Sequence, residues 1–364
     1  MPASLKLCTI VGARPQFIKA AVVSRAIGEH NKKGTDTIAE TIVHTGQHFD
    51  ANLSDIFFDE LAIPRPDHHL GVGGGTHGQN TGRMLEKIED IFLQNRPDWV
   101  LVYGDTDSTL AGALAASKLH IPVAHVEAGL RSYNRRMPEE INRVLTDHVS
   151  QLLLTPTDQA TKNLATEGIQ GDRVQQVGDV MNDAAIFYGK RAISSSKILE
   201  KIGVAPKTYV LATIHRAENT DDPERLRAIL SGLSKSQRPV VLPVHPRLRR
   251  RMDEFSLQFP KNLIAIEPVG YLDMVRLEQS ASVVATDSGG VQIEAFFHHV
   301  PCITLRDETE WVETVEMGWN VLVGADAEKI GDAMNKHGVP VEAHHFCYGN
   351  GDAGERIVEI LLSL

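Results

Sequence analysis

Near its beginning the chain reads Leu7-Cys8-Thr9-Ile10-Val11-Gly12-Ala13-Arg14-Pro15-Gln16-Phe17-Ile18-Lys19, a short apolar run, a glycine turn and the start of a helical pattern. The run over Leu7–Val11 has the composition of a strand, and residues 16–29 have the helical period. A strand that turns directly into a helix is the building unit of a parallel sheet covered by helices. The opening therefore predicts an α/β fold.

The same alternation continues through the first half of the chain. Further strands are predicted at Thr41–His44, Trp99–Tyr103, Val123–Val126 and Leu152–Leu154, and further helices at 51–61, 79–94, 107–119, 138–148 and 158–167. After Gly178-Asp179 the pattern starts again. Strands are then predicted at Tyr209–Thr213, Val240–Pro243, Leu263–Ile266, Val283–Thr286, Cys302–Leu305 and Val321–Val323.

Two doubly wound, Rossmann-like domains follow from this repetition, over residues 1–180 and 181–351. The length of 364 residues agrees with two domains, since one core rarely serves more than about 250 residues. Ligands of such sheets bind beyond the carboxyl ends of the strands. We therefore expect the active site in a cleft between the two domains.

Composition excludes several classes of partner. The formal charge of −10 repels nucleic acid and anionic membranes, so an anionic ligand requires a local cationic site. The three cysteines, Cys8, Cys302 and Cys347, form no CxxC pair, which fits free thiols in a reducing cytoplasm. No apolar stretch approaches the ~18 residues of a membrane span. We expect a cytoplasmic protein with no membrane or nucleic-acid partner.

Two turns are candidates for binding an anion. Arg14 and Lys19 lie at the start of the first helix, where backbone N–H groups already favour negative charge. In the second domain a strand ends in Thr286-Asp287-Ser288-Gly289-Gly290, and Glu294 lies one turn into the next helix. The glycines allow close approach of a phosphate, Ser288 can donate, and Glu294 can accept from ribose hydroxyls. The alternatives are a solvated Arg14 and a common Gly-Gly turn; neither turn has P-loop or GxGxxG spacing.

Three carboxylates are candidates for acid–base chemistry: Asp105 and Glu127 after predicted strands, and Glu139 in the first turn of a helix. A partly desolvated carboxylate holds its proton more strongly, which suits proton transfer near neutral pH. The alternatives are that Asp105 caps the helix near Ser108, and that Glu139 serves the helix dipole and pairs with Arg143.

A histidine and an arginine, His215-Arg216, follow the predicted strand Tyr209–Thr213. A role at a phosphate or a leaving group suits this pair. The other histidine pairs, 68–69, 298–299 and 344–345, lack HxxxH spacing or nearby cysteines, so no metal site is predicted.

In combination these segments resemble the non-hydrolysing UDP-N-acetylglucosamine 2-epimerase family over nearly the whole chain. The motifs that carry the resemblance are Gly12-Ala13-Arg14-Pro15 with Lys19, His44-Thr45-Gly46-Gln47-His48, Gly104-Asp105-Thr106, His125-Val126-Glu127-Ala128-Gly129-Leu130-Arg131, Pro138-Glu139-Glu140-Ile141-Asn142-Arg143, His215-Arg216-Ala217-Glu218-Asn219 and Thr286-Asp287-Ser288-Gly289-Gly290. The resemblance implies a glycosyltransferase-B-like fold whose final helix, here about 352–364, packs back on the first domain. It also implies a homodimer.

The activity implied by the resemblance is inversion of C2 of a UDP-linked acetamido sugar, for bacterial surface polysaccharides. UDP leaves by anti elimination to give 2-acetamidoglucal and is then added back. Carried over by motif, Asp105, Glu127 and Glu139 are the acid–base groups and His215 assists at the diphosphate. Arg14, Lys19, Ser288, Gly289, Gly290 and Glu294 bind UDP. No redox cofactor is expected, because no hydride moves.

UDP-N-acetylglucosamine is the first candidate substrate. The sequence departs from the family's common pattern at Arg135-Arg136 and at Trp311-Val312. These variants resemble the branch that acts on UDP-2,3-diacetamido-2,3-dideoxyglucuronate. Arg135 or Arg136 could pair with the C6 carboxylate of that sugar, or both could be exposed loop arginines.

Three other functions share parts of this pattern: a glycosyltransferase, a hydrolysing epimerase and a nucleotide-sugar sensor. A glycosyltransferase needs one base and an acceptor, and a sensor needs no proton-transfer group. The three acidic candidates favour the epimerase. Incubation with a UDP-sugar alone discriminates, since only an epimerase gives an epimeric UDP-sugar without an acceptor.

Overall fold

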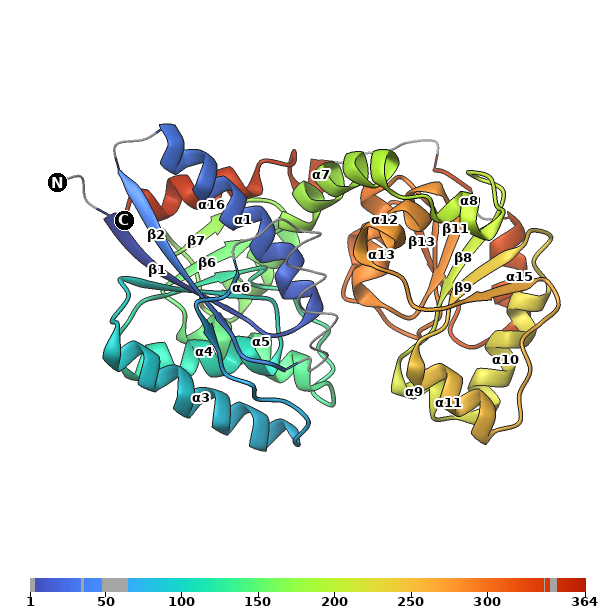
Figure 1. The fold of residues 1–364 in the computed structure, drawn as a ribbon, viewed down its shortest axis with the longest axis horizontal. Helices are drawn as coiled ribbons and strands as arrows, with labels where there is room; N and C mark the ends of the chain where they lie inside the picture. Colours follow the sequence, from blue (N-terminus) through green and yellow to red (C-terminus); the bar gives the residue numbers. More distant parts are fainter. Residues whose placement is uncertain (1–3, 34–35, 48–64, 337, 341–345) are drawn as a thin grey trace. The chain divides into compact units, whose positions relative to one another are not determined.

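The computed structural model describes residues 4–33, 36–47, 65–336, 338–340 and 346–364. The chain forms two compact units, residues 1–184 with 345–364, and residues 185–344 (Figure 1). It passes into the second unit within helix α7 (Val180–Ser195). The boundary predicted at residue 180 lies a few residues before this division. None of the helices in the described ranges has the length and apolar character that a membrane crossing requires.

The first unit is built on a parallel seven-stranded sheet in the order β3-β2-β1-β4-β5-β6-β7. Its strands are β1 (Ser4–Val11), β2 (Thr37–His44), β3 (His68–His69), β4 (Trp99–Tyr103), β5 (Val123–Val126), β6 (Leu152–Thr155) and β7 (Val174–Gln176). Its helices are α1 (Arg14–Lys33), α3 (His77–Gln94), α4 (Asp107–Lys118), α5 (Pro138–Val149), α6 (Asp158–Thr166) and α16 (Ala353–Leu362), with a 3-10 turn at Phe346–Tyr348. Helices cover both faces, so the central strands are apolar throughout and fully buried, as at Val100, Leu101 and Val102.

The second unit repeats this architecture with a parallel six-stranded sheet in the order β10-β9-β8-β11-β12-β13. Its strands are β8 (Val210–Thr213), β9 (Val240–Pro243), β10 (Leu263–Ile266), β11 (Val283–Thr286), β12 (Cys302–Thr304) and β13 (Asn320–Leu322). Its helices are α8 (Ile198–Ile202), α9 (Ala217–Thr220), α10 (Pro223–Ser234), α11 (Pro246–Glu254), α12 (Tyr271–Ser280), α13 (Gly289–Phe297), α14 (Val312–Glu316) and α15 (Ala327–Lys336). One apolar core under this sheet joins β8, β9 and β11 to α10 and α15.

Helix α16 belongs to the first unit although it follows the second unit in the chain. It lies beside α1 (Figure 1). Gly354 makes the close approach possible, because a Cβ there would lie 2.8 Å from Cγ1 of Val22. The Asp183 carboxylate fixes the start of α16 by accepting hydrogen bonds from the backbone N–H groups of Ala353 and Gly354, at 3.3 and 3.0 Å.

The prediction of two Rossmann-like parallel-sheet domains is confirmed, and several strands have the predicted bounds, among them β4, β5 and β11. Strands β3 and β7 were not predicted. They contain two and three residues, which is too short for a hydrophobic period to show. The helix predicted at 51–61 and the motif residue His48 lie outside the described residues.

Candidate active site

The carboxyl ends of β1, β4 and β5 form the centre of the candidate site in the first unit. These strands are neighbours in the sheet, so the residues that follow them meet at one edge. Lys19 comes from α1 after β1, Asp105 follows β4, and Glu127 follows β5. The sheet order therefore brings together three residues that are far apart in the sequence.

Glu127 has an unusual backbone conformation. Its φ of 70° lies in the left-handed region, which a non-glycine residue adopts only when its surroundings hold it there. Its carboxylate is 8% exposed and forms an ion pair with the Lys19 ammonium group. Gly104 lies directly beside this pair, since a Cβ at Gly104 would be 3.3 Å from Nζ of Lys19. Such strain at a buried ion pair is typical of a functional site.

Opposing charges control the protonation of this cluster. Burial lowers the pKa of Lys19, but the neighbouring Glu127 carboxylate outweighs burial, so the net pKa is raised and the ammonium form is favoured. Burial and the negative charge of Glu127 raise the pKa of Asp179 to about 7. Asp179 caps α7 through a hydrogen bond from the Met181 N–H at 2.8 Å, and its other carboxyl oxygen is buried with no hydrogen-bond partner among the described residues.

Sequence reasoning did not select Asp179 as a site residue, because Gly178-Asp179 was used only to mark the domain boundary. Asp179 follows β7 at the same edge of the sheet as Glu127, but β7 is too short to be predicted from the sequence, so no local pattern marked this position.

Helix α5 supplies the surroundings of Asp105. Nη2 of Arg143 lies 2.5 Å from Oδ2 of Asp105, and the Asn142 amide donates to the Asp105 carbonyl at 3.0 Å. The helix-cap alternative for Asp105 was wrong. Thr106 caps α4 instead, with Thr109 completing the capping box, so the Asp105 side chain turns to Arg143.

Glu139 and Glu140 are adjacent on α5, but their carboxylates differ in burial and in hydrogen-bond partners. The Glu140 carboxylate is buried and accepts hydrogen bonds from the backbone N–H groups of Ser132 and Tyr133, both at 2.9 Å. Glu139 is half-buried, and the described part of the chain gives its carboxylate no hydrogen bond or ion pair. Arg143, the partner considered for Glu139, contacts Asp105 and Glu140. The structure thus leaves Glu139 available for a ligand.

The remaining first-unit candidates are arginines. Arg14 begins α1, but its side chain lies outside the described residues. Arg135 and Arg136 are exposed in the turn before α5, whereas the Lys19 and Glu127 side chains are only 10% and 8% exposed. Gln16 shapes the turn around Arg14, since its side-chain oxygen accepts from the N–H groups of Gly12 and Ala13, at 2.8 and 3.0 Å.

In the second unit, Asp287 organises the loop after β8. Its buried carboxylate accepts from Nδ1 of His215 at 3.0 Å and from the N–H groups of His215 and Arg216 at 3.0 to 3.1 Å. Burial would raise the pKa of Asp287, but the hydrogen bond and charge of His215 outweigh burial and lower it. Nδ1 of His215 is therefore a donor to a carboxylate, and the ring, 39% exposed, can present Nε2 to a ligand.

A second histidine, His245, lies beside His215, with ring centroids 5.8 Å apart. Its pKa is lowered by burial and then by the charges of His215 and Arg247, so it stays neutral near pH 7. Nδ1 of His245 accepts from the Arg247 N–H, which makes Nε2 the ring's donor. His245 follows β9, the same kind of position as His215, and this place at a strand end had marked it in the sequence as a residue that could do chemistry.

The Ser288-Gly289-Gly290 turn starts α13. The Ser288 hydroxyl caps the helix by accepting from the Val291 N–H at 3.3 Å, while the N–H groups of the first turn have no partner within the helix. A Cβ at Gly289 would lie 2.2 Å from Oε1 of Glu310 and would displace that side chain, whereas a Cβ at Gly290 would meet nothing nearer than Oγ of Ser288 at 3.9 Å. The space over Gly290 therefore suits an anion.

Two residues complete this turn. Glu294, the predicted ribose acceptor, is 9% exposed on the first turns of α13. Trp311 donates its indole N–H to the Gly289 carbonyl at 2.9 Å. The residue at which the sequence departs from the common family pattern therefore contacts the Ser288-Gly289-Gly290 turn directly.

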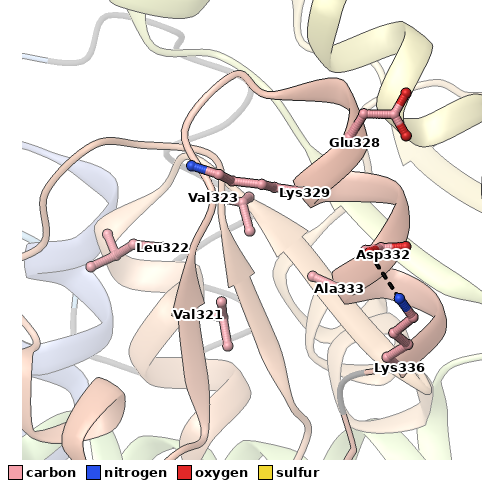
Figure 2. Close-up of a pocket in the computed structure, with 8 residues that line it drawn as sticks. All are labelled: Val321, Leu322, Val323, Glu328, Lys329, Asp332, Ala333 and Lys336. Carbon is pink, nitrogen blue, oxygen red and sulfur yellow. Dashed lines mark hydrogen bonds and ion pairs between the residues drawn. The ribbon is translucent and has the colours of Figure 1, made fainter.

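A separate hollow of about 490 Å³ lies between β13 and α15, with an apolar floor that includes Val321 and Val323 (Figure 2). Its rim carries the exposed ion pair of Lys336 with Asp332. None of the site residues predicted from the sequence lines it. Among the described residues, no three His, Cys, Asp or Glu side chains gather as metal ligands would.

Comparison with known proteins gives one consistent result. The sequence profile of the UDP-N-acetylglucosamine 2-epimerase family matches residues 30–362. A Pseudomonas aeruginosa protein, UDP-2,3-diacetamido-2,3-dideoxy-D-glucuronate 2-epimerase, is 54% identical, with 99% of this chain and 100% of that protein covered.

Solved structures agree with the sequence comparison. The Methanocaldococcus jannaschii UDP-GlcNAc 2-epimerase in complex with UDP-GlcNAc and UDP is 45% identical with a TM-score of 0.89, covering 99% of this chain and 100% of that one. The Neisseria meningitidis enzyme bound to UDP-GlcNAc is 30% identical with a TM-score of 0.86, at the same coverage. The expected class of fold is confirmed.

Proposed function

Because the chain belongs to the UDP-N-acetylglucosamine 2-epimerase family, we propose that it inverts C2 of a UDP-linked acetamido sugar. In the forward half-reaction the C2 proton passes to a base while the bond from C1 to the UDP oxygen breaks. UDP leaves with the bonding electrons, and a C1–C2 double bond forms in the 2-acetamidoglucal. In the return half-reaction UDP adds to C1 and C2 accepts a proton on its other face.

The first unit supplies the proton-transfer groups in this proposal. Inversion requires a base on one face of C2 and an acid on the other. Asp105, Glu127 and Glu139 are the candidates, because all three come from the carboxyl edge of one sheet or the helix beside it. The observation that carries the proposal is the strained, buried Glu127 paired with Lys19, with Asp105 on the next strand.

The second unit supplies the nucleotide site. The start of α13, at Ser288-Gly289-Gly290, offers N–H donors and an open approach to a diphosphate. His215, oriented by Asp287, can donate to UDP as negative charge develops on it. We assign Glu294 to the ribose, and Arg14 and Lys19 to the diphosphate or the groups around it. No redox cofactor or metal is needed, because the reaction moves only protons and UDP.

UDP-N-acetylglucosamine is the first candidate substrate, since the family profile and two solved relatives bear its name. The second candidate is UDP-2,3-diacetamido-2,3-dideoxyglucuronate, on which the Pseudomonas aeruginosa relative acts and for which Arg135 and Arg136 offer cations. We also propose a cytoplasmic homodimer that makes precursors of bacterial surface polysaccharide. Sedimentation of the purified protein tests the dimer.

An NMR time course in deuterated water tests the activity. Each UDP-sugar is incubated with the protein alone, and C1 and C2 signals of substrate and product are followed. We expect an epimeric UDP-sugar that carries deuterium at C2 in both epimers. Retention of protium at C2 contradicts elimination, release of free sugar indicates hydrolysis, and no change without an acceptor indicates transfer.

A further inference from the structure

His125 lies on β5, two residues before Glu127, and has no part in the proposed chemistry. Its imidazole is fully buried, and both ring nitrogens are engaged. Nδ1 lies 2.7 Å from Oδ1 of Asp147, and Nε2 lies 2.7 Å from the carbonyl oxygen of Gly104. Both contacts are short, so the position of each hydrogen has a large effect on the energy.

Asp147, at the end of α5, is a carboxylate in this network. Its Oδ2 accepts from the Gly129 N–H at 3.1 Å and from Nη1 of Arg131 at 2.7 Å, so donors occupy both of its oxygens. Burial would raise the pKa of Asp147, but the positive charges of His125 and Arg131 outweigh burial and lower it. A carboxylate only accepts, and therefore the hydrogen between Asp147 and His125 belongs to Nδ1 of the ring.

The second ring contact leads to the same conclusion. The Gly104 carbonyl can only accept, so Nε2 must also carry a hydrogen. An imidazole with hydrogens on both nitrogens is a cation. The geometry therefore requires the doubly protonated ring, independently of any titration argument.

Arg131 connects Asp147 to a second carboxylate. Besides its contact with Asp147 it binds Glu167, at the end of α6, through two hydrogen bonds of 2.7 Å. The Glu167 side chain is 24% exposed, whereas the side chains of His125, Arg131 and Asp147 are buried. The His125 ring therefore lies at the buried end of this chain of contacts.

The other ionisable groups near the ring contact partners other than Asp147. His148 on α5 lies 3.3 Å from Glu167 at the exposed end. On the β4 side Asp105 pairs with Arg143. These groups do not replace Asp147 as the counterion of the His125 ring.

The Gly104 peptide connects this network to the candidate site. Gly104 has a φ of 61°, its N–H donates to the Val126 carbonyl at 3.0 Å, and its carbonyl accepts from His125. The next residue is Asp105, and the Gly104 Cα lies beside the Lys19–Glu127 pair. If Nε2 lost its hydrogen, two lone pairs would face each other across 2.7 Å. The peptide would have to turn, and Asp105 would move with it.

We propose that His125 is a positioning residue for the epimerisation, acting as a doubly protonated ring clamped between Asp147 and the Gly104 carbonyl. It holds the Gly104 peptide in its left-handed turn and thereby aims Asp105 and supports the Lys19–Glu127 pair. The inference rests on the proposed function for the reaction that these groups serve. The protonation of the ring is a separate statement, which can be tested without substrate.

The first experiment measures directly whether each ring nitrogen of His125 carries hydrogen. The unmodified protein is labelled with ¹⁵N in its histidine rings, and Asp147→Asn assigns the His125 signals by displacing them. At pH 7.5 we expect both His125 ring nitrogens to carry hydrogen. A nitrogen without hydrogen overturns the proposal, whatever the enzyme activity proves to be.

The second experiment uses two variants that remove one charge each from the same network. Asp147→Asn removes the partner of the ring, whereas Glu167→Gln removes the partner of Arg131 and leaves the His125 contacts in place. In Asp147→Asn we expect the ring to lose its second hydrogen, because a neutral amide supplies no negative charge to hold it. Raising the pH from 6 to 8 should then lower kcat for deuterium entry at C2 in Asp147→Asn. This fall should be at least tenfold larger than the fall in the unmodified protein, and KM should not change.

Glu167→Gln should keep the pH profile of the unmodified protein. Circular dichroism and UDP binding show that both variants are folded. Matching pH profiles in both variants, or an effect confined to KM, would refute positioning by His125. If no UDP-sugar reacts even with the unmodified protein, the proposed function fails, while the NMR result on the ring stands.

Discussion

Replacing Asp179 by asparagine should stabilise the first unit at alkaline pH and have much less effect at acid pH. Asparagine has the same shape and can still accept the hydrogen bond from the Met181 N–H. It lacks the buried carboxyl whose pKa is raised to about 7 by burial and by the charge of Glu127. The comparison therefore isolates the cost of ionising this group.

The sign and size follow from linkage. An aspartate in the unfolded chain has its ordinary pKa of 3.8, so between pH 3.8 and about 7 the folded state keeps a proton that the unfolded state releases. Stability therefore falls as pH rises through this window. The ceiling is about 4 kcal/mol, because each pKa unit corresponds to about 1.4 kcal/mol. That value already includes the favourable charge of Lys19, so we expect Asp179→Asn to gain between about 1 and about 4 kcal/mol at pH 8 relative to pH 4.

Trp99 makes the measurement possible, because it is the one tryptophan of the first unit; Trp311 and Trp319 belong to the second. Urea unfolding is followed by Trp99 fluorescence from pH 4 to pH 8, with both other tryptophans changed to phenylalanine in every protein compared. This separates the first unit from a two-domain transition.

Asp183→Asn is the matched control. The pKa of Asp183 is raised to about 6 by burial, so its pH response should be complete one unit earlier than that of Asp179. If the stability difference between Asp179→Asn and the unmodified protein is the same from pH 4 to pH 8, Asp179 is not a high-pKa group and the reasoning fails.

Four further outcomes are expected. Lys19→Met leaves the buried Glu127 carboxylate without its cation, so the unfolding free energy should drop by roughly 3 kcal/mol in urea and deuterium entry at C2 should fall; unchanged values of both would show the pair to be incidental. Arg135→Gln with Arg136→Gln should cut kcat/KM for the diacetamidoglucuronate roughly 10- to 100-fold, worth about 2 kcal/mol, and spare UDP-N-acetylglucosamine; equal losses on both sugars refute a role at C6. Gly290→Ala should fold normally but weaken UDP binding about tenfold by calorimetry, and undiminished affinity would place the diphosphate elsewhere. EDTA should leave turnover unchanged, and loss of activity would contradict a metal-free reaction.

The sheet architecture was predictable because local sequence patterns indicate which segments form strands and which form helices. Runs such as Trp99–Tyr103 and Val123–Val126 are apolar throughout, which marks strands buried on both faces, and the segments between them have a helical period. Placing Asp105 and Glu127 at strand ends followed from the same patterns. Their proximity depends on β4 and β5 being neighbours, which no local pattern states.

The partners of individual side chains were less predictable. Whether Arg143 binds Asp105 or Glu139 depends on the packing of α5 against the sheet, and the sequence offered only the helical spacing. The raised pKa of Asp179 arises from burial and from a residue 52 positions away in the sequence, so composition around Asp179 could not reveal it. The cap of α4 likewise depends on the backbone conformation: the sequence reasoning considered Asp105 for it, and Thr106 is the residue that caps the helix.

The return of α16 to the first unit has a consequence for synthesis on the ribosome. The 160 residues of the second unit are translated before α16, which takes about 10–30 s at 5–20 residues per second. During that interval α1 has emerged without the helix that covers it, and the faces later filled by Gly354, Ile357 and Leu361 are open to other nascent chains and to chaperones. The second unit needs no later segment and can fold first. Slow codons ahead of residue 353 should therefore lengthen the aggregation-prone period of the first unit alone.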